Sequence, residues 1–226
     1  MRVVEVFRGE AARLAGVLAG LTESDFARPT RCAPWNVREL VAHVSIGAGR
    51  MVGMLAEPAP PRAEVDAAAY FGPAKFAPAT DAARIDTARQ HGAGSGTGRD
   101  IAEEFARTWR AGYAVSLAAP PGRLVRTRHG DPMTLEEFLV TRVVELGVHG
   151  LDLAAALDRE PWLTEPAGEL IAELLVRAAG PAAAGLAEEH HWDRLTLVAK
   201  ATGRRPLTAA ERVELDRRGV RWLSFG

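Results

Sequence analysis

Four polar residues in the segment 136–157 are of types that bind metals or act in catalysis, and their spacing allows them to act together. Intervals of three, four and three residues place them on one side of an α-helix: Arg142, Glu145, His149 and Asp152. The rest of the segment is apolar on nearly every side, so a helix here must be largely buried. An ionised carboxylate left unpaired there is costly. A divalent metal ion that binds a Glu145 oxygen and a His149 nitrogen removes that cost.

A structural interpretation of the same residues stays open. Arg142, Glu145 and Asp152 would then form a buried salt-bridge network, and His149 would be a hydrogen-bonded core histidine. His43 favours the metal, because it is a second histidine in an apolar helical segment and bundles build metal sites from facing helices. Two histidines and one carboxylate leave a coordination position open, which is typical of catalytic zinc. We predict one catalytic divalent ion, zinc by its ligands, on His43, Glu145 and His149.

Four long helices are expected to position these side chains, because apolar residues recur at helical spacing. Their ranges are 3–21, 36–55, 81–118 and 135–157. Glycines at 91–98 interrupt the third helix and leave 101–117 as its firm part. Asn36 and Thr134 are good N-caps, and Glu137 is placed to complete a capping box with Thr134. Segment 22–34 predicts a turn region, segment 57–80 a long proline-rich crossover, and segment 124–129 a short strand before a turn at Asp131 and Pro132.

Beyond Pro161 the pattern predicts a short C-terminal appendage, residues 161–226, after a metal-binding bundle of residues 1–160. A fifth helix is expected over 167–179 and an edge strand over 194–199. A last helix is expected over 209–217, with Thr208 and Glu211 forming a capping box. The fold class is therefore dominated by α-helices: a four-helix bundle with a small α/β C-terminal appendage.

Composition excludes several classes of function. The formal net charge of -1 gives no electrostatic basis for binding nucleic acid or an anionic membrane surface. No apolar run reaches the roughly 18 residues that a membrane span needs. Cys32 is the only cysteine, so an internal disulfide and a thiolate metal cluster are excluded. We expect a cytoplasmic monomer or homodimer whose partners are small molecules. Arginines far outnumber lysines, which indicates a GC-rich genome.

Two segments resemble the mycothiol-dependent maleylpyruvate isomerase family, within the wider DinB-like metalloenzyme superfamily. TRCAPWNVRELVAHV (30–44) carries Cys32, Trp35 and His43, and TRVVELGVHGLDLAAAL (141–157) carries the four polar residues described above. The tail 195–215 resembles a C-terminal segment of actinobacterial members. The resemblance implies a DinB-like four-helix bundle, a metal held by His43, Glu145 and His149, and mycothiol as cosubstrate. The isomerase has a longer C-terminal domain than residues 161–226 provide, so a thiol transferase or conjugating role fits as well as isomerisation.

The implied chemistry joins a thiol to a small electrophile. A thiol with a pKa of about 8.5 is mostly protonated at neutral pH, and coordination to a metal deprotonates it. The thiolate would then attack an electrophilic carbon; it stays attached in a transferase and leaves again in an isomerase. Arg142 and Asp152 are the expected catalytic residues beside the ligands. Asp152 would orient a ligating histidine through its free ring nitrogen, and Arg142 would hold a substrate carboxylate or pair with Asp152 or Glu145.

Two other classes of function remain. One is a non-catalytic metal-binding module that acts in interactions or regulation. The other is a metal-dependent hydrolase, for which Asp152 is the obvious general base. Cys32 is expected to be a core or loop residue. It precedes the helix that carries His43, so it should lie more than about 10 Å from the ligands unless the loop folds back. The sulfur nucleophile is therefore expected to come from outside the chain.

Overall fold

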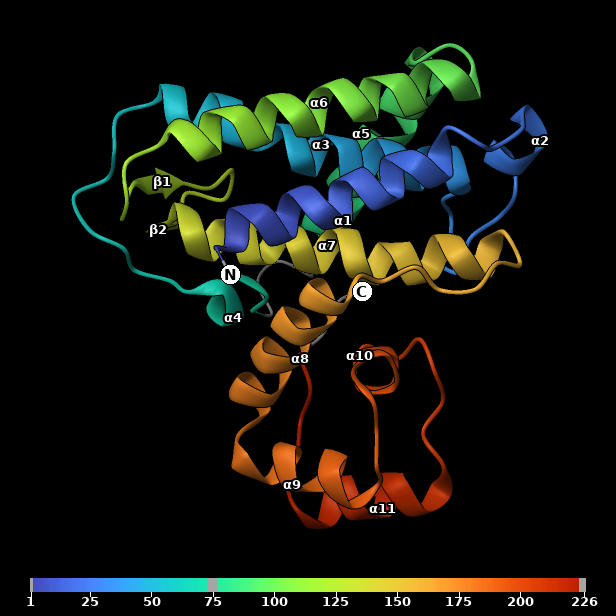
Figure 1. Ribbon diagram of the computed structural model, residues 1–226, viewed down its shortest axis with the longest axis vertical. Coiled ribbons are helices and arrows are strands. Elements are labelled where there is room, and N and C mark those ends of the chain that lie inside the picture. The colour runs from blue at the N-terminus through green and yellow to red at the C-terminus, as the bar shows by residue number, and fades with distance from the viewer. Residues whose placement is uncertain (1, 73–76, 224–226) are drawn as a thin grey trace.

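Four long helices form the body of the molecule in a computed structural model that describes residues 2–72 and 77–223 (Figure 1). They are α1 (Val3–Leu18), α3 (Val37–Ala56), α6 (Gly98–Ala118) and α7 (Leu135–Ala156). Helix α3 packs against α6 and α7, and α1 packs against the same two helices. The predicted four-helix bundle is confirmed. The predicted break in the third helix is confirmed, because α5 (Pro78–Gly94) ends inside the glycine-rich stretch before α6 begins.

Capping residues explain where the two site-bearing helices begin. The Asn36 side chain accepts a hydrogen bond from the Glu39 backbone N–H, and the Glu39 side chain accepts one from the Asn36 N–H. Thr134 caps α7 as predicted, because its hydroxyl accepts from the Glu137 N–H. The expected capping box there is incomplete. Glu137 instead accepts from the backbone N–H of Ala67 and so ties the crossover to α7.

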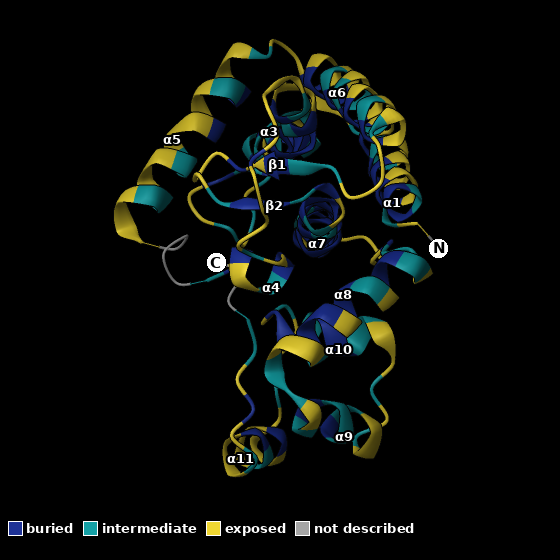
Figure 2. Cartoon of the chain, turned by 90° about the vertical axis from the view of Figure 1, so that its left-hand side faces the viewer, coloured by how far each residue is buried: buried dark blue, intermediate teal, exposed yellow. Residues whose placement is uncertain are grey.

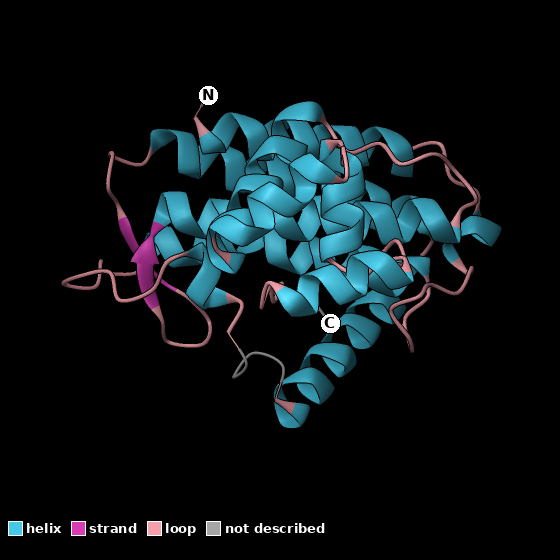
Figure 3. Cartoon of the chain, turned by 90° about the horizontal axis from the view of Figure 1, so that it is seen from below, coloured by secondary structure: helices cyan, strands magenta, loops and turns pink. Residues whose placement is uncertain are grey.

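Short elements occupy the segments expected to be turns and crossover. Helix α2 (Glu23–Phe26) lies in the first turn region and α4 (Ala67–Tyr70) in the crossover. Strands β1 (Leu124–Arg126) and β2 (Pro132–Thr134) form an antiparallel pair in which Val125 faces Met133. The predicted strand thus ends earlier than expected, and Pro132 starts a strand and not only a turn. Figure 3 shows this small sheet at one end of the helices.

Up to residue 223, the C-terminal part folds into four helices: α8 (Glu165–Ala179), α9 (Pro181–Glu189), α10 (Arg194–Ala201) and α11 (Ala209–Arg217). The predicted edge strand at 194–199 is wrong, so the described part of the appendage is α-helical and not α/β. Asp193 caps α10 by accepting from the Thr196 N–H, and the helix buries Leu197 and Val198. The six residues 194–199 alternate only weakly between apolar and polar types. So short a pattern does not distinguish a strand from a short helix that is buried on one side. The boundary at residue 160 stays a prediction.

Helix α7 lies at the centre of the molecule and is buried on nearly every side, as Figure 2 shows. Helices α1, α3 and α8 all pack on it. A polar side chain on α7 is therefore placed inside protein and not at a surface. Within residues 2–72 and 77–223, no helix has the length and apolar character needed to cross a membrane.

Candidate metal centre

His43 on α3 converges with Glu145 and His149 on α7. The Nε2 atom of His43 lies 3.3 Å from Oε2 of Glu145, and Nε2 of His149 lies 3.3 Å from the same oxygen. The two imidazole rings are nearly perpendicular, with centroids 5.2 Å apart. All three candidate ligand atoms lie within 4.8 Å of one another. The predicted convergence is confirmed, and the role of these residues as metal ligands remains a prediction.

These separations fit a divalent ion. Zinc binds histidine nitrogen and carboxylate oxygen at about 2.0–2.2 Å, so two ligand atoms at a tetrahedral angle lie roughly 3.3–3.5 Å apart. The two 3.3 Å separations match that edge length. Two nitrogens and one oxygen are also a donor set typical of catalytic zinc. The three residues could therefore hold one ion with little movement and leave a fourth position free.

The protonation of the three side chains follows from their surroundings. Burial lowers the pKa of His43 to about 4, so its imidazole is neutral at neutral pH. Burial alone would raise the pKa of Glu145, but hydrogen bonds to His149 and His43 hold that pKa well below its usual value. Burial would likewise lower the pKa of His149, but its bonds to Asp152 and neighbouring groups raise it well above the usual value. Because ligand nitrogens must be free of protons to bind an ion, metal binding would compete with protonation of His149.

Asp152 contacts the far side of the His149 ring, and its role in orienting a metal ligand stays a prediction. Its Oδ2 atom lies 3.0 Å from Nδ1 of His149, which leaves Nε2 directed at Glu145. Arg204, from the segment after α10, donates to both carboxylate oxygens of Asp152 at 3.0 and 2.9 Å. The possible pairing of Asp152 with Arg142 is not observed. Arg142 instead lies 3.8 Å from Oε1 of Glu145.

The expected distance of Cys32 from the ligands is wrong. Its sulfur lies 3.1 Å from Oδ2 of Asp152 and 4.0 Å from Nδ1 of His149. The loop before α3 folds back on itself, with a bridge between Pro29 and Asn36, and this brings Cys32 beside α7. The sulfur approaches the ring nitrogen of His149 that faces away from Glu145. Cys32, His149 and Asp152 therefore form a second group of potential ligand atoms, but Arg204 already neutralises its carboxylate.

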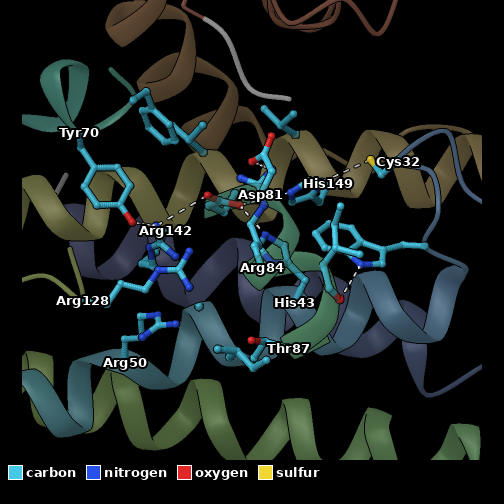
Figure 4. Close-up of a pocket in the computed structure, with 18 of the residues that line it drawn as sticks. Cys32, His43, Arg50, Tyr70, Asp81, Arg84, Thr87, Arg128, Arg142 and His149 are labelled. Carbon is cyan, nitrogen blue, oxygen red and sulfur yellow. Dashed lines mark hydrogen bonds and ion pairs between the residues drawn. The ribbon is translucent and has the colours of Figure 1, made fainter. Parts of the chain in front are cut away.

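A cavity of about 340 Å³ opens beside the ligand cluster, a size that suits a small molecule. In Figure 4, His43, His149 and Cys32 lie on one side, and Tyr70, Arg50, Arg128 and Arg142 lie on the other. The Trp35 ring lines the cavity and stacks on the ring of His43, with centroids 4.8 Å apart. Sequence reasoning did not find Arg50, Arg128, Tyr70 or Arg204 as site residues. Only Arg50 carried a signal, because it lies two helical turns after His43.

A comparison with protein families now adds to the geometry. The model described as the mycothiol maleylpyruvate isomerase N-terminal domain matches residues 7–154. The chain belongs to this family. The match runs from α1 to near the end of α7, so it includes His43, Glu145, His149 and Asp152.

Solved structures give the same answer for the fold. The crystal structure of the mycothiol-dependent maleylpyruvate isomerase aligns with a TM-score of 0.55 at 14% sequence identity. That of a histidine-to-alanine mutant aligns with a TM-score of 0.54 at 13% identity. Each alignment covers 75% of this chain and 66% of the solved chain, just under two thirds of it. This likeness establishes the DinB-like fold of the maleylpyruvate isomerases. A comparison with curated protein sequences finds no match.

Proposed function

We propose that this member of the family is a metal-dependent enzyme that uses a low-molecular-weight thiol, mycothiol, as cosubstrate. The reaction is S-transfer to a small electrophile or its thiol-assisted isomerisation. One observation carries the proposal: His43, Glu145 and His149 converge at the wall of a cavity and supply only three ligands. Family membership supports the thiol, because the matching family is named for mycothiol.

The chain's own residues have distinct tasks in this proposal. His43, Glu145 and His149 would hold the ion, zinc by their donor set. A bound divalent ion would supply Lewis acidity and would keep a thiol deprotonated at neutral pH. Asp152 accepts the Nδ1 proton of His149 and so fixes the ring with Nε2 toward the cluster. Trp35 stacks on His43 and restrains the plane of the second imidazole.

The cavity brings the two substrates together. Its volume of about 340 Å³ admits a small electrophile beside the thiol end of the cosubstrate. Holding both reactants in one place replaces a bimolecular encounter by an oriented contact. A new sulfur–carbon bond then forms. In a transferase it persists, and the attacked carbon either releases a leaving group with its bonding electrons or, where the sulfur adds to a double bond, the neighbouring carbon takes up a proton. In an isomerase the sulfur adds to the conjugated double bond, the resulting single bond rotates, and the sulfur leaves again as the double bond re-forms. Arg142, beside Glu145 and at the cavity wall, is placed to balance negative charge on the substrate.

The geometry favours this function over the two alternatives. A hydrolase needs a general base near the reacting water. Asp152 does not suit that task, because Arg204 and His149 occupy its oxygens on the side of the ring remote from Glu145. The bonds to His149 and Arg204 also hold its pKa below the usual value, although burial alone would raise it. A non-catalytic module would not need a cavity beside an incompletely coordinated ion.

The test combines elemental analysis with a conjugation assay. Consumption of maleylpyruvate and of an activated haloarene is followed with and without mycothiol, and before and after metal chelation. We expect close to one ion per chain and turnover that requires both ion and thiol. His149→Ala should lose the ion and the turnover, whereas His191→Ala, which removes an exposed histidine, should retain both. Turnover that survives chelation, or metal content unchanged in His149→Ala, would contradict the proposal.

A further inference from the structure

The cavity beside the ligand cluster is rich in positive charge. Five arginines and two carboxylates line it: Arg31, Arg50, Arg84, Arg128, Arg142, Asp81 and Glu145. Three of the arginines lie near acidic groups, since Arg31 approaches Asp152, Arg84 pairs with Asp81 and Arg142 approaches Glu145. Within the described residues, no carboxylate lies within 4.0 Å of a nitrogen of Arg50 or Arg128. Among the described residues, the cavity therefore holds two cationic groups, Arg50 and Arg128, without a carboxylate in ion-pair distance.

The helices place this charge at a defined distance from the ligand cluster. Arg50 follows His43 by seven residues on α3, and Arg142 precedes His149 by seven residues on α7. Seven residues make about two turns, so both arginines start roughly 10 Å along the helix from the histidine. His43 of α3 meets His149 of α7, and Gly47, one turn further along α3, faces Arg142, which precedes His149 on α7. The two helices therefore run in opposite directions, and both arginines reach the same end of the cavity. Arg128, between β1 and β2, lies there too (Figure 4).

Arg142 is fixed before any ligand arrives. Its Nε donates to the Thr141 hydroxyl at 3.1 Å, and Nη2 donates to the Tyr70 hydroxyl at 3.3 Å. Its guanidinium lies 4.8 Å from the centre of the Phe138 ring. Gly47 makes room for it, since a Cβ there would lie 2.7 Å from Nη1. A guanidinium held in this way loses little freedom when it binds an anion.

The three arginines also affect one another. Burial, together with the charges of Arg128 and Arg142, lowers the pKa of Arg50 to about 10. Arg50 is thus still cationic at neutral pH, and like charges meet in a partly enclosed space. An oxyanion between them would relieve this repulsion and accept paired hydrogen bonds from the guanidinium groups.

We propose that Arg50, Arg128 and Arg142 form an oxyanion subsite that anchors an acidic group of the small substrate. The ligand chemistry is a carboxylate, phosphate or sulfonate, and a dianion matches three guanidiniums better than a monoanion. The subsite itself is inferred from the arginines alone. That its occupant is the electrophilic substrate rests on the proposed function. Arg142 Nη2 lies 3.8 Å from Oε1 of Glu145, so one small molecule can reach both the subsite and the ligand cluster.

The experiment is a calorimetric titration of metal-free protein at low ionic strength, so that no anion can bind a metal ion. The probes are phosphate, sulfate, succinate and the neutral amide succinamide. At least one anion should bind and succinamide should not. Arg50→Ala should weaken binding at least about tenfold, the loss expected for a hydrogen bond to a charged group. Arg126→Ala removes the same charge from an exposed position on β1 and should change binding less than about twofold.

Two further variants make the result specific. Gly47→Ala forces the Arg142 guanidinium to move and should weaken anion binding without removing a charge. Gly53→Ala, on the same helix but in open space, should leave anion binding unchanged. The titration needs neither metal nor thiol, so anion binding by a protein that shows no metal-dependent thiol activity would separate failure of the proposed function from failure of the subsite. The subsite is overturned if none of the anions binds, or if Arg126→Ala weakens binding as much as Arg50→Ala does.

Discussion

Arg204 joins the C-terminal part of the chain to the candidate metal centre, and its removal should destabilise the fold. Its Nε and Nη2 atoms donate to the two oxygens of Asp152 at 3.0 and 2.9 Å. The Arg204 side chain is 6% exposed and that of Asp152 is 0% exposed. Arg204→Ala would leave a buried carboxylate whose other contacts are His149, Cys32 and the more distant Arg31.

The size of the effect follows from this geometry. Removal of one partner from a buried ion pair costs about 3–5 kcal/mol. The lower end applies here, because the His149 ring at 3.0 Å and Arg31 at 3.8 Å still compensate the carboxylate. In a chain of this length each kcal/mol lowers Tm by about 2–4 °C. The Tm of Arg204→Ala should therefore fall by about 6–12 °C.

Thermal unfolding of the metal-free protein, followed by calorimetry, measures this change. Arg205→Ala is the matched control, because Arg205 is the next residue and is exposed, and its side chain donates to the Thr196 hydroxyl at 2.9 Å. A surface substitution of that kind should change the free energy of unfolding by no more than about 0.5 kcal/mol. The reasoning is refuted if Arg204→Ala and Arg205→Ala have the same Tm.

Three other substitutions, one of them with a matched control, test separate parts of the structure. Burial raises the pKa of Glu10 above 4.5. The folded state therefore holds a proton on Glu10 that the unfolded state has lost, and the free energy of unfolding falls as pH rises through the folded pKa. Glu10→Gln should abolish this pH dependence, measured by urea unfolding between pH 4 and 7. Gly112→Ala places a Cβ 2.6 Å from the backbone oxygen of Ala48 and should cost about 1–3 kcal/mol, whereas Gly53→Ala, which meets open space, should not destabilise. Asp152→Asn should weaken metal binding about 10–100-fold in a chelator competition, and unchanged affinity would remove its orienting role.

Long helices could be predicted from the sequence because their apolar pattern repeats over many turns. Helix α7 and the cap at Asn36 were found in this way, and the range of α11 was predicted without error. The four-residue helices α2 and α4 were missed, since so few residues carry no periodicity. Helix α10 was predicted as a strand for the same reason, because it is short. Its cap at Asp193 and its three buried residues, Leu197, Val198 and Ala201, fix it as a helix despite the weak alternation of the sequence.

The site was predictable where its residues lie on those long helices. His43, Glu145 and His149 stand out because polar side chains on buried helices need partners. Arg204 and Arg128 come from loops, and their position depends on how distant segments pack, which no local pattern records. Cys32 was misplaced because its distance from His43 was measured along an extended path, whereas the loop folds back toward α7.

One measurement tests the central claim most directly: that three protein ligands hold an ion whose open position takes a thiol sulfur. Cobalt(II) is bound to Cys32→Ser, which removes the only thiol of the chain, 4.0 Å from Nδ1 of His149. Mycothiol is then added while the near-ultraviolet spectrum is recorded. We predict a sulfur-to-cobalt charge-transfer band that saturates at one thiol per ion and is absent from His149→Ala. If cobalt is bound but neither mycothiol nor any other cellular thiol produces the band, the account is contradicted.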